Sequence, residues 1–330
     1  MSTFNAPLSH TQAEESASEL YRALLRREPD EEGMKLYAGK INSFGLASVV
    51  REFLASDEYR QHSLGAPSLD LNWGPSMLVQ TELTSDQLDT LWQHVQQVWT
   101  NLGVIDPFWS VLSSEKYRKS NMDDQSALEE FYASGISDIN YLKAYLNRSG
   151  LSLGPDIIAA EYGCGLGRVT RYLAQEVGSV IAFDISASHL AAARERLHHD
   201  EIKNVEFIHV NERADLSKMK DIKLFFSLIV LQHNPPPVII DVLKAAFSSL
   251  IQGGIAFFQV PVYSKNYEFS VQEYLKTSFE NRSMEMHFLS QKTIFQLAKE
   301  NGMRVLEVRS DHWTGNYDSW ISNTFLMQKE

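Results

Sequence analysis

The sequence predicts an α/β protein built on a doubly wound, mostly parallel sheet, and three observations support this fold class. An apolar run at 157–160 leads into a glycine-rich turn at 161–168, and a helix-like segment at 169–177 follows. The next apolar segment, 179–184, ends on the acid Asp184. Further apolar segments alternate with helical ones toward the C-terminus. Strand, glycine turn, helix and strand in that order form one half of a nucleotide-binding sheet.

Five more strand-like segments follow along the chain, at 204–210, 223–231, 254–261, 304–309 and 322–328. The segment at 223–231 is almost uninterrupted hydrophobe, as expected of a strand buried on both faces. The last two segments are expected to close the sheet as an antiparallel hairpin. The sequence therefore predicts seven strands over residues 151–330.

The glycine turn reads Glu161-Tyr162-Gly163-Cys164-Gly165-Leu166-Gly167-Arg168. Glycine suits a position where the backbone turns sharply and a ligand approaches without a Cβ in the way. A dinucleotide fingerprint would need Gly or Ala where Arg168 stands, which disfavours a nicotinamide dehydrogenase. The G-x-G-x-G spacing after an acid resembles the first motif of class I S-adenosylmethionine (SAM)-dependent methyltransferases. The seven-strand plan resembles theirs as well.

This resemblance implies SAM as the cofactor and suggests which residues bind it. In that family the acid before the loop, here Glu161, helps to hold the sulfonium-bearing half of SAM. Asp184 would accept both ribose hydroxyls; the alternative is that it only caps the next helix, for which Ser186 is a competing N-cap. Asn211 and Glu212 are equal candidates for binding the adenine amino group. The implied cofactor residues are Glu161, Gly163, Gly165, Gly167, Asp184, Ser186, Asn211, Glu212 and Ser227.

Histidine is the side chain best suited to deprotonate a hydroxyl acceptor at neutral pH. His233, directly after the fourth strand, is the first candidate for this base. His287 is the second, with Glu285 as its partner. The alternative for each histidine is a structural hydrogen bond in a loop. Together with Asp311 and His312, His287 and Glu285 form a weaker candidate for a divalent metal, but no tight ligand spacing supports it and no metal site is predicted.

The acceptor is expected beyond the carboxyl ends of the strands, where ligands lie in open α/β sheets. The segments that hold Trp109 and Tyr132 resemble those of some bacterial SAM-dependent methyltransferases, where they form a helical cap over the cofactor and the substrate mouth, which implies such a cap at 81–150. A loop at 311–315 and an aromatic insert at 262–289 are also expected beside that region. An aromatic lid of this kind would exclude water and stack on a flat or sugar-like acceptor. The candidate substrate residues are Trp109, Tyr132, Tyr263, Tyr267 and Trp313. For Trp109, packing of the cap onto the sheet is an equally good interpretation.

The N-terminal part is predicted to be a helical accessory domain at 13–62, after a flexible tail at 1–12. Its pattern Tyr-Arg-x-Leu-Leu-x-Arg-Glu-Pro-Asp at 21–30 resembles a small bacterial domain of uncharacterised role. That domain accompanies glycosyltransferases, methyltransferases and secreted surface proteins. It is expected to dock a partner, a second copy or the catalytic domain. Residues 63–80 are predicted to be a linker to the cap.

Bulk properties exclude several classes of protein. The net charge of −12 disfavours nonspecific binding to nucleic acid or to an anionic membrane surface. The single cysteine, Cys164, allows neither an internal disulfide nor a cysteine-based zinc site. The first residues do not resemble a signal peptide, and no apolar stretch reaches membrane-spanning length, so the expected location is cytoplasmic.

The predicted function is methyl transfer from SAM to a hydroxyl of a small molecule or glycan intermediate. The glycan hypothesis rests on the proteins that the N-terminal domain accompanies. Two alternatives stay open. One is an N- or C-methyltransferase of a natural-product pathway, and the other is a non-catalytic scaffold with a methyltransferase fold. The intact glycine turn and Asp184 argue against the scaffold.

Overall fold

The computed structural model describes residues 9–25, 27–56, 58–59, 79–265, 267–278, 284–315 and 319–330. The chain divides into two compact units, Met1–Gly74 and Pro75–Glu330. The division falls inside the predicted linker, of which residues 63–78 lie outside the described ranges, as do residues 1–8 of the predicted tail. No helix in the described part of the chain is long and apolar enough to cross a membrane.

The N-terminal unit consists of helices around a small core of its own. Its elements are α1 (His10–Leu20), a π-helical turn (Tyr21–Leu25), α2 (Glu31–Phe44) and α3 (Leu46–Ala55). Ser9 and Gln12 form a capping box at the start of α1, and the Asp30 carboxylate caps α2. The buried core side chains are Ala13, Ala17, Tyr21, Leu25, Ala38, Ile41, Val49 and Phe53. The alanines at these positions let the helices approach one another closely.

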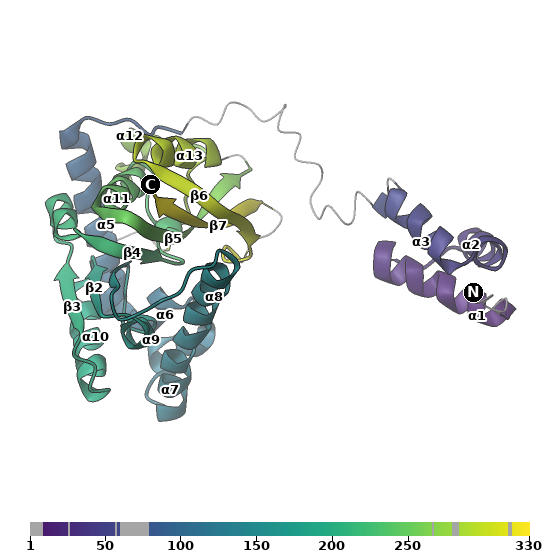
Figure 1. Cartoon of the computed structure of the whole chain (residues 1–330), viewed down its shortest axis with the longest axis horizontal. Helices are drawn as coiled ribbons and strands as arrows, with labels where there is room; N and C mark the ends of the chain where they lie inside the picture. Colours follow the sequence, from purple (N-terminus) through teal and green to yellow (C-terminus); the bar gives the residue numbers. More distant parts are fainter. Residues whose placement is uncertain are drawn as a thin grey trace. The chain divides into compact units, whose positions relative to one another are not determined.

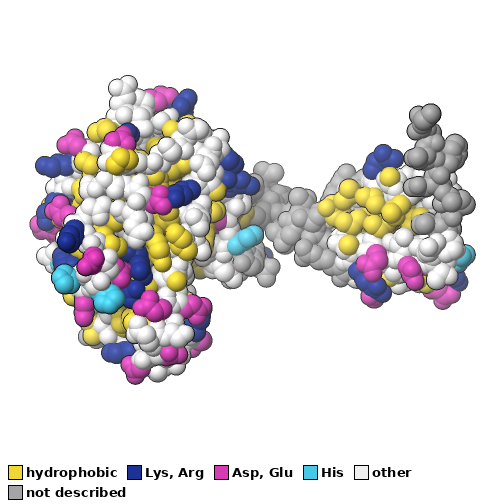
Figure 2. All heavy atoms as spheres, turned by 60° about the horizontal axis from the view of Figure 1, so that its bottom comes forward, with side chains coloured by type: hydrophobic (Ala, Val, Ile, Leu, Met, Phe, Trp, Pro, Cys, Tyr) yellow, Lys and Arg dark blue, Asp and Glu magenta, His cyan; other side chains and the backbone are white. Residues whose placement is uncertain are grey.

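Large apolar side chains of the N-terminal unit also stay exposed. They are Leu36, Phe44, Leu46 and Leu54, and Phe44 keeps 72% of its surface in solvent. Figure 2 shows an apolar patch on the face of this unit that is turned to the viewer. Exposed apolar patches commonly mark interaction surfaces. A docking role for this unit stays a prediction.

The second unit is organised around one seven-stranded sheet (Figure 1). Its strands are β1 (Ile158–Tyr162), β2 (Ser179–Asp184), β3 (Val205–His209), β4 (Ile222–Ser227), β5 (Leu250–Ser264), β6 (Met303–Asp311) and β7 (Trp320–Lys329). The strand order is β3-β2-β1-β4-β5-β7-β6. The pairs among β1 to β5 are parallel, and β7 is antiparallel to both of its neighbours. The predicted seven-strand, doubly wound fold is confirmed.

Helices cover both faces of the sheet (Figure 1). The helices of this unit are α5 (Ser85–Ile105), α6 (Pro107–Val111), α7 (Gln125–Ala133), α8 (Gly135–Arg148), α9 (Thr170–Glu176), α10 (Ala187–His199), α11 (Pro236–Ser249), α12 (Val271–Tyr274) and α13 (Gln291–Glu300), of which α6 and α7 pack in a separate cluster. Short 3₁₀ turns cover Glu115–Tyr117, Lys119–Asn121, Arg213–Lys218 and Leu231–His233. One apolar cluster joins the sheet to α5, α11 and α13, and another joins it to α8, α9 and α10.

The buried strands supply side chains to both clusters because successive residues of a strand point to opposite faces. In β4, Phe225 packs in the cluster with α11, whereas Leu224 and Phe226 pack in the cluster with α8 and α9. In β5, Phe258 and Phe257 divide in the same way. Burial on both faces therefore accounts for the unbroken apolar pattern of these strands.

The largest differences from the expected strand boundaries are at the end of β4 and the start of β5. β4 ends at Ser227 and not at Leu231, because Ile229 has a φ of 58°, which breaks the extended backbone. β5 begins at Leu250, before the expected Gly254, since the chain enters the strand directly from α11. The early end of β4 shapes the molecular surface, because the turn after it borders a cavity at the carboxyl ends of the strands.

Candidate active site

The main cavity lies at the carboxyl ends of β1, β2 and β4, where α5 and α6 contribute to its wall. The glycine loop lines one side, and the turn after β4 lines the other. Its lining residues are Trp99, Ser110, Val111, Glu161, Tyr162, Gly163, Cys164, Gly165, Arg168, Val169, Asp184, Ile185, His189, Phe226, Leu228, Ile229, Val230, His233 and Asn234. The prediction of a ligand beyond the carboxyl ends thus agrees with the position of this cavity.

The glycine loop presents bare backbone to the cavity. Gly163 has a φ of +80° and Gly165 a φ of +53°, a region that other residues rarely adopt. A Cβ on Gly163 would lie 2.4 Å from the Cγ1 atom of Val230, and one on Gly165 would lie 2.9 Å from Val111. Both positions therefore require glycine for conformation and for space.

Asp184 holds the glycine loop in place. Its Oδ2 atom accepts a 2.7 Å hydrogen bond from the N–H of Gly165, and its Oδ1 atom accepts a 2.8 Å bond from the N–H of Ser186. The side chain is almost fully buried yet lines the cavity. Since each carboxylate oxygen can accept two hydrogen bonds, Asp184 retains acceptor capacity toward a ligand.

Glu161 offers a buried carboxyl group that lacks a complete set of partners. Only 3% of the residue is exposed, and its Oε2 atom is buried without a hydrogen-bond partner. Burial raises the pKa of this carboxyl to about 7. A cationic ligand in the cavity would favour the ionised form and satisfy the buried oxygen.

Arg168 is the only Lys or Arg among the described lining residues; its two terminal nitrogens are hydrogen-bonded, whereas its Nε is buried without a partner. Its guanidinium donates to Asp138 at 2.5 Å and to Ser134 at 3.2 Å. Both partners flank the start of α8, so Arg168 ties the glycine loop to that helix. The described lining therefore presents two carboxylates, Glu161 and Asp184, beside one arginine that is paired with Asp138, which suits a positively charged ligand better than a phosphate.

Helix α5 connects the two helical layers beside the cavity. In the first half of α5, Trp92 Nε1 donates to Asp241 of α11 at 3.0 Å. Near its end, Gly103 lies against the N-terminus of α10, where a Cβ would come within 2.4 Å of the Ser186 Oγ atom. Trp99 lines the cavity between these two contacts. The cap is thus part of the wall of the site.

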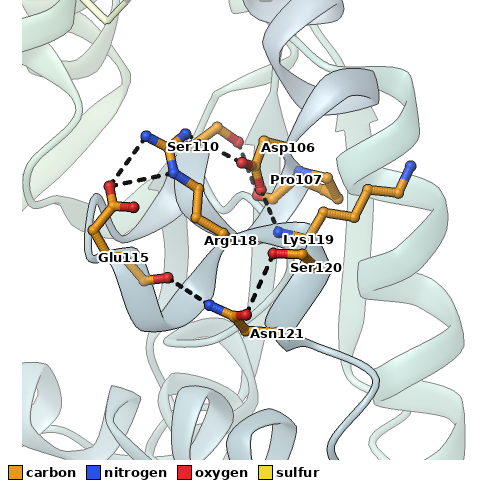
Figure 3. A network of polar contacts seen from close by, with 8 residues as sticks. All are labelled: Asp106, Pro107, Ser110, Glu115, Arg118, Lys119, Ser120 and Asn121. Carbon is orange, nitrogen blue, oxygen red and sulfur yellow. Dashed lines mark hydrogen bonds and ion pairs between the residues drawn. The ribbon is translucent and has the colours of Figure 1, made fainter.

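A network of polar contacts holds α6 beside α5 (Figure 3). Asp106 joins the two helices and accepts from the Arg118 guanidinium at 3.2 Å and from the Lys119 N–H at 2.8 Å. Arg118 also pairs with Glu115 at 3.2 Å. Because these contacts fold the segment after α6 back onto Asp106, they hold Ser110 in the cavity wall.

His233 is held as a neutral imidazole at the other side of the cavity. Burial lowers its pKa to about 4. Its Nδ1 atom lies 2.7 Å from the Glu285 carbonyl oxygen, which can only accept, so Nδ1 carries the proton. The Nε2 lone pair then accepts from the side-chain amide of Gln232 at 3.1 Å. The hydrogen-bond network thus defines a single tautomer.

A chain of buried amides supports His233 from behind. The Gln259 amide donates to Gln232 Oε1 at 3.0 Å and to Ser322 Oγ at 2.6 Å. Gln259 Oε1 accepts the N–H of Ile229 at 3.1 Å. Ile229 adopts a left-handed φ that is costly for a β-branched residue, and such strain tends to persist where surrounding contacts impose it. The chain therefore fixes both His233 and the turn that lines the cavity.

Comparison with known families decides the class of this site. Residues 159–254 match the family model described as a methyltransferase domain. This segment runs from β1 into β5 and includes the glycine loop, Asp184 and His233. The chain carries a SAM-dependent methyltransferase domain. The predicted enzyme class and the SAM cofactor are confirmed.

A second family model covers the N-terminal unit of this methyltransferase. Residues 2–63 match a domain of unknown function, DUF4214. This agrees with the resemblance predicted for that region. No curated protein matches the chain.

Solved methyltransferase structures resemble the chain at low sequence identity. Magnesium protoporphyrin IX methyltransferase from Synechocystis PCC 6803, solved with bound SAH, is 14% identical; the match covers 72% of this chain and 98% of that one, with a TM-score of 0.47. Phosphoethanolamine N-methyltransferase 2 from Haemonchus contortus is 18% identical, with coverage of 58% and 52% and a TM-score of 0.42. An rRNA methylase from Streptococcus thermophilus is 15% identical, with coverage of 58% and 95% and a TM-score of 0.39. Similarity at this level says nothing about the acceptor of this methyltransferase.

The cavity of the methyltransferase fits SAM on two structural grounds. Gly163 and Gly165 line the cavity and present backbone to it without a side chain. The buried Glu161 oxygen without a partner suits the positive sulfonium or amino group of SAM. Asp184 lines the same cavity and retains acceptor capacity for ribose hydroxyls.

Several predicted cofactor residues lie outside the cavity lining. Gly167 faces Leu197 and Ala193 of α10. Ser186 caps α10 by accepting from the N–H of His189 at 3.4 Å. Ser227 donates to the Tyr162 carbonyl oxygen at 3.0 Å. These residues support the loop and strands from outside the cavity.

Asn211 and Glu212 follow β3 as expected, but both are exposed and neither lines the cavity. Their backbone N–H groups donate to Asp215 at 2.9 and 3.1 Å. Asn211 Oδ1 also accepts from Gln96 of α5 at 3.4 Å. A role at adenine stays a prediction for both residues.

The predicted substrate aromatics likewise lie outside the described cavity lining. Trp109 stacks against the Arg118 guanidinium, 3.9 Å from its ring centroid. Tyr132 is buried in the cap, and burial raises its pKa to about 12. Trp313 packs edge-on against Tyr141 in a separate depression beside α8 and β6. Trp109 thus contacts another residue of the cap, and its role at the substrate stays a prediction.

The insert before α13 approaches the cavity through its backbone. Tyr267 contacts His287 Nδ1 at 2.6 Å, while Tyr263 lies in β5. His287 Nε2 lies 3.5 Å from Glu285 Oε2, and the His287 N–H donates to the Gln232 carbonyl oxygen at 2.7 Å. His287 and Glu285 thus brace the His233 turn without lining the cavity. The described residues contain no group of three or more His, Cys, Asp or Glu side chains that could hold a metal ion.

Lining residues that were not predicted as site residues include Trp99, Ser110 and His189. His189 follows Asp184 by five residues, in the first turn of α10, so its position next to that acid had a signal in the spacing. Trp99 and Ser110 had none. Their approach depends on how α5 and α6 pack over the sheet, which is a tertiary property.

Proposed function

We propose that this enzyme methylates a hydroxyl group of a small molecule or glycan intermediate, with His233 as the base. One observation carries the proposal: a neutral imidazole with a defined tautomer lines the same cavity as Asp184 and the glycine loop. SAM, when bound, supplies a methyl group already activated by its sulfonium. The enzyme must then align the acceptor and remove its proton.

His233 is suited to that proton transfer because its Nε2 atom has the free electron pair of the ring. In the present arrangement the Gln232 amide donates to this atom. An acceptor hydroxyl would take the place of that amide hydrogen and pass its proton to Nε2. The N–H at Nδ1 would keep its hydrogen bond to the Glu285 carbonyl oxygen. This hydrogen bond would stabilise the imidazolium that forms.

The first experiment identifies the acceptor atom. We would incubate the enzyme with SAM carrying a ¹³C-labelled methyl group and an extract of the source cells. The ¹³C shift of the transferred methyl group distinguishes an ether from an N-methyl or a C-methyl product. An N-methyl or C-methyl signal would overturn the hydroxyl proposal and leave the methyltransferase class intact.

The second experiment tests the base. His233→Asn retains a donor toward the Glu285 carbonyl and removes the Nε2 acceptor. We expect turnover to fall about a hundredfold, since general bases contribute roughly that much or more, with SAH affinity nearly unchanged. His287→Gln is the matched control and should retain turnover. Full activity of His233→Asn together with loss in His287→Gln would transfer the role to His287.

The pH profile gives a further check. His233 acts as a base only when neutral, and its pKa is lowered to about 4. At saturating SAM, turnover should therefore stay level as the pH falls from neutral to about 5, and decline below that. A decline centred near the ordinary histidine pKa would contradict this assignment. The cytoplasmic location, the glycan acceptor and a partner for the N-terminal unit remain predictions from the sequence.

A further inference from the structure

Ser110 of the cap determines which nitrogen of His189 carries a proton. The Ser110 hydroxyl donates to the Pro107 carbonyl oxygen at 2.8 Å. The same oxygen lies 3.0 Å from His189 Nε2. A hydroxyl has one proton, so both contacts are satisfied together only when the ring donates from Nε2. A ring with a single proton then has its lone pair on Nδ1.

This tautomer leaves two acceptors facing each other in the cavity. His189 Nδ1 lies 3.7 Å from Asp184 Oδ1. Both side chains line the cavity and are more than nine-tenths buried. Asp184 Oδ1 accepts the N–H of Ser186 and Oδ2 accepts that of Gly165, so both backbone donors are used by the carboxylate and neither is given to the ring. Two close buried acceptors are unfavourable unless a ligand supplies donors.

We propose that His189 Nδ1 is a second acceptor for the ribose hydroxyls of the cofactor, beside Asp184, in a tautomer set by Ser110. Vicinal hydroxyls carry one proton each, so a ribose can donate once to the carboxylate and once to the ring. The proposal rests on the placement of the ribose at Asp184. It makes His189 a cofactor-binding residue and Ser110 a positioning residue.

The surrounding cap keeps His189 in this orientation. Gly103 of α5 lies so close that a Cβ there would be 3.1 Å from His189 Nε2. Asp106, at the junction of α5 and α6, is held by Arg118 and Lys119 and so fixes the helix that carries Ser110 (Figure 3). The cap therefore contacts the proposed ribose site directly, through Ser110 and Gly103 against His189. Binding of the ribose should stabilise the cap.

The test measures binding of SAH and of its 2′-deoxy and 3′-deoxy analogues by calorimetry. In the wild-type enzyme, removal of either hydroxyl should weaken binding about tenfold, as expected for a lost hydrogen bond to a buried acceptor. In His189→Leu, SAH should bind about tenfold more weakly, and one of the two analogues should bind the variant as well as it binds the wild type. This pattern is the coupling expected of a direct contact.

Three further variants separate a direct contact from a structural effect. His189→Asn places an acceptor near the position of Nδ1 and should restore most of the affinity for SAH. Ser110→Ala frees the ring to change its tautomer and should weaken SAH binding severalfold. This variant should also prefer SAH over the two deoxy analogues less strongly than the wild type does. His199→Leu, an exposed substitution on the same helix, should change nothing.

The outcomes distinguish this proposal from the one on which it rests. If His189→Leu weakens SAH and both analogues by the same factor, the ring is structural and the proposal fails. If Asp184→Ala abolishes the preference for intact ribose while His189→Leu retains it, the ribose lies at Asp184 without help from His189. If neither variant alters the preference, the ribose lies elsewhere and the assignment of Asp184 fails too.

Discussion

The two sides of the cavity are built in different ways. On the glycine-loop side, residues 161–186 supply most of the contacts from one continuous stretch, largely through backbone atoms. On the side of His233, the contacts are side chains from β5 and β7 and backbone groups from the insert before α13. A site made of local backbone is encoded in a short motif, whereas a site made of distant side chains depends on the completed sheet.

The same physical cause acts on one titratable group at each side, with opposite results. Burial raises the pKa of Glu161 to about 7 and lowers that of His233 to about 4, because it disfavours the charged form of both. Glu161 therefore contributes stability that is fully present below its ordinary pKa and is lost as the pH rises through 7. His233 contributes stability that is present above its ordinary pKa and is lost as the pH falls toward 4.

The largest expected effect is on the backbone-built side. Gly163→Ala should destabilise the protein by about 4 kcal/mol, since it adds left-handed strain to a clash with Val230. SAH binding should be lost in the same variant. The control Gly253→Ala has a similar φ of +77° but no neighbour within 4 Å, so it should cost about 1 kcal/mol and retain binding. If chemical denaturation showed the same loss of stability in Gly163→Ala and Gly253→Ala, backbone strain alone would explain the effect at Gly163.

The next effect concerns the carboxyl group on the same side. Glu161→Gln removes the cost of ionising a buried acid whose pKa rises from 4.5 to about 7. The ligand-free variant should therefore be about 3 kcal/mol more stable than wild type near pH 8, with the difference vanishing near pH 4. Its affinity for SAM should fall at the same time. Denaturation curves across this pH range check the slope, and a constant difference would contradict the burial effect.

The smallest of the three effects is on the side built from distant side chains. Gln259→Met leaves the Ile229 N–H and the side-chain Oε1 atom of Gln232 without their buried partner and should cost about 2 kcal/mol. Turnover should fall while SAH affinity stays the same, because only the His233 side is disturbed. Gln328→Met, the same substitution in β7, should retain turnover. If SAH affinity fell with turnover in Gln259→Met, the two sides would not be independent.

Prediction from the sequence succeeded on the side where it had a local signal. β2 was expected at 179–184 and spans Ser179–Asp184, and the glycine turn leads into α9 as expected. The site residues without a local signal were harder to predict. Asn211 and Glu212 were chosen because they follow β3, yet they are exposed, since the chain turns there into a 3₁₀ segment capped by Asp215. Trp109 and Tyr132 were chosen for their aromatic rings, but they pack within the cap.

The sequence by itself determined the fold class, the glycine loop and the acid at the end of β2. Each of these depends on residues near in the chain and on the constraints that a turn places on φ and on Cβ. Only the tertiary structure decided the tautomers of His233 and His189, the roles of Gln259 and Ser110, and the closure of the cavity by α5 and α6. Those features arise where side chains far apart in the sequence meet, and a hydrogen bond has no sequence signature until both partners have been brought together.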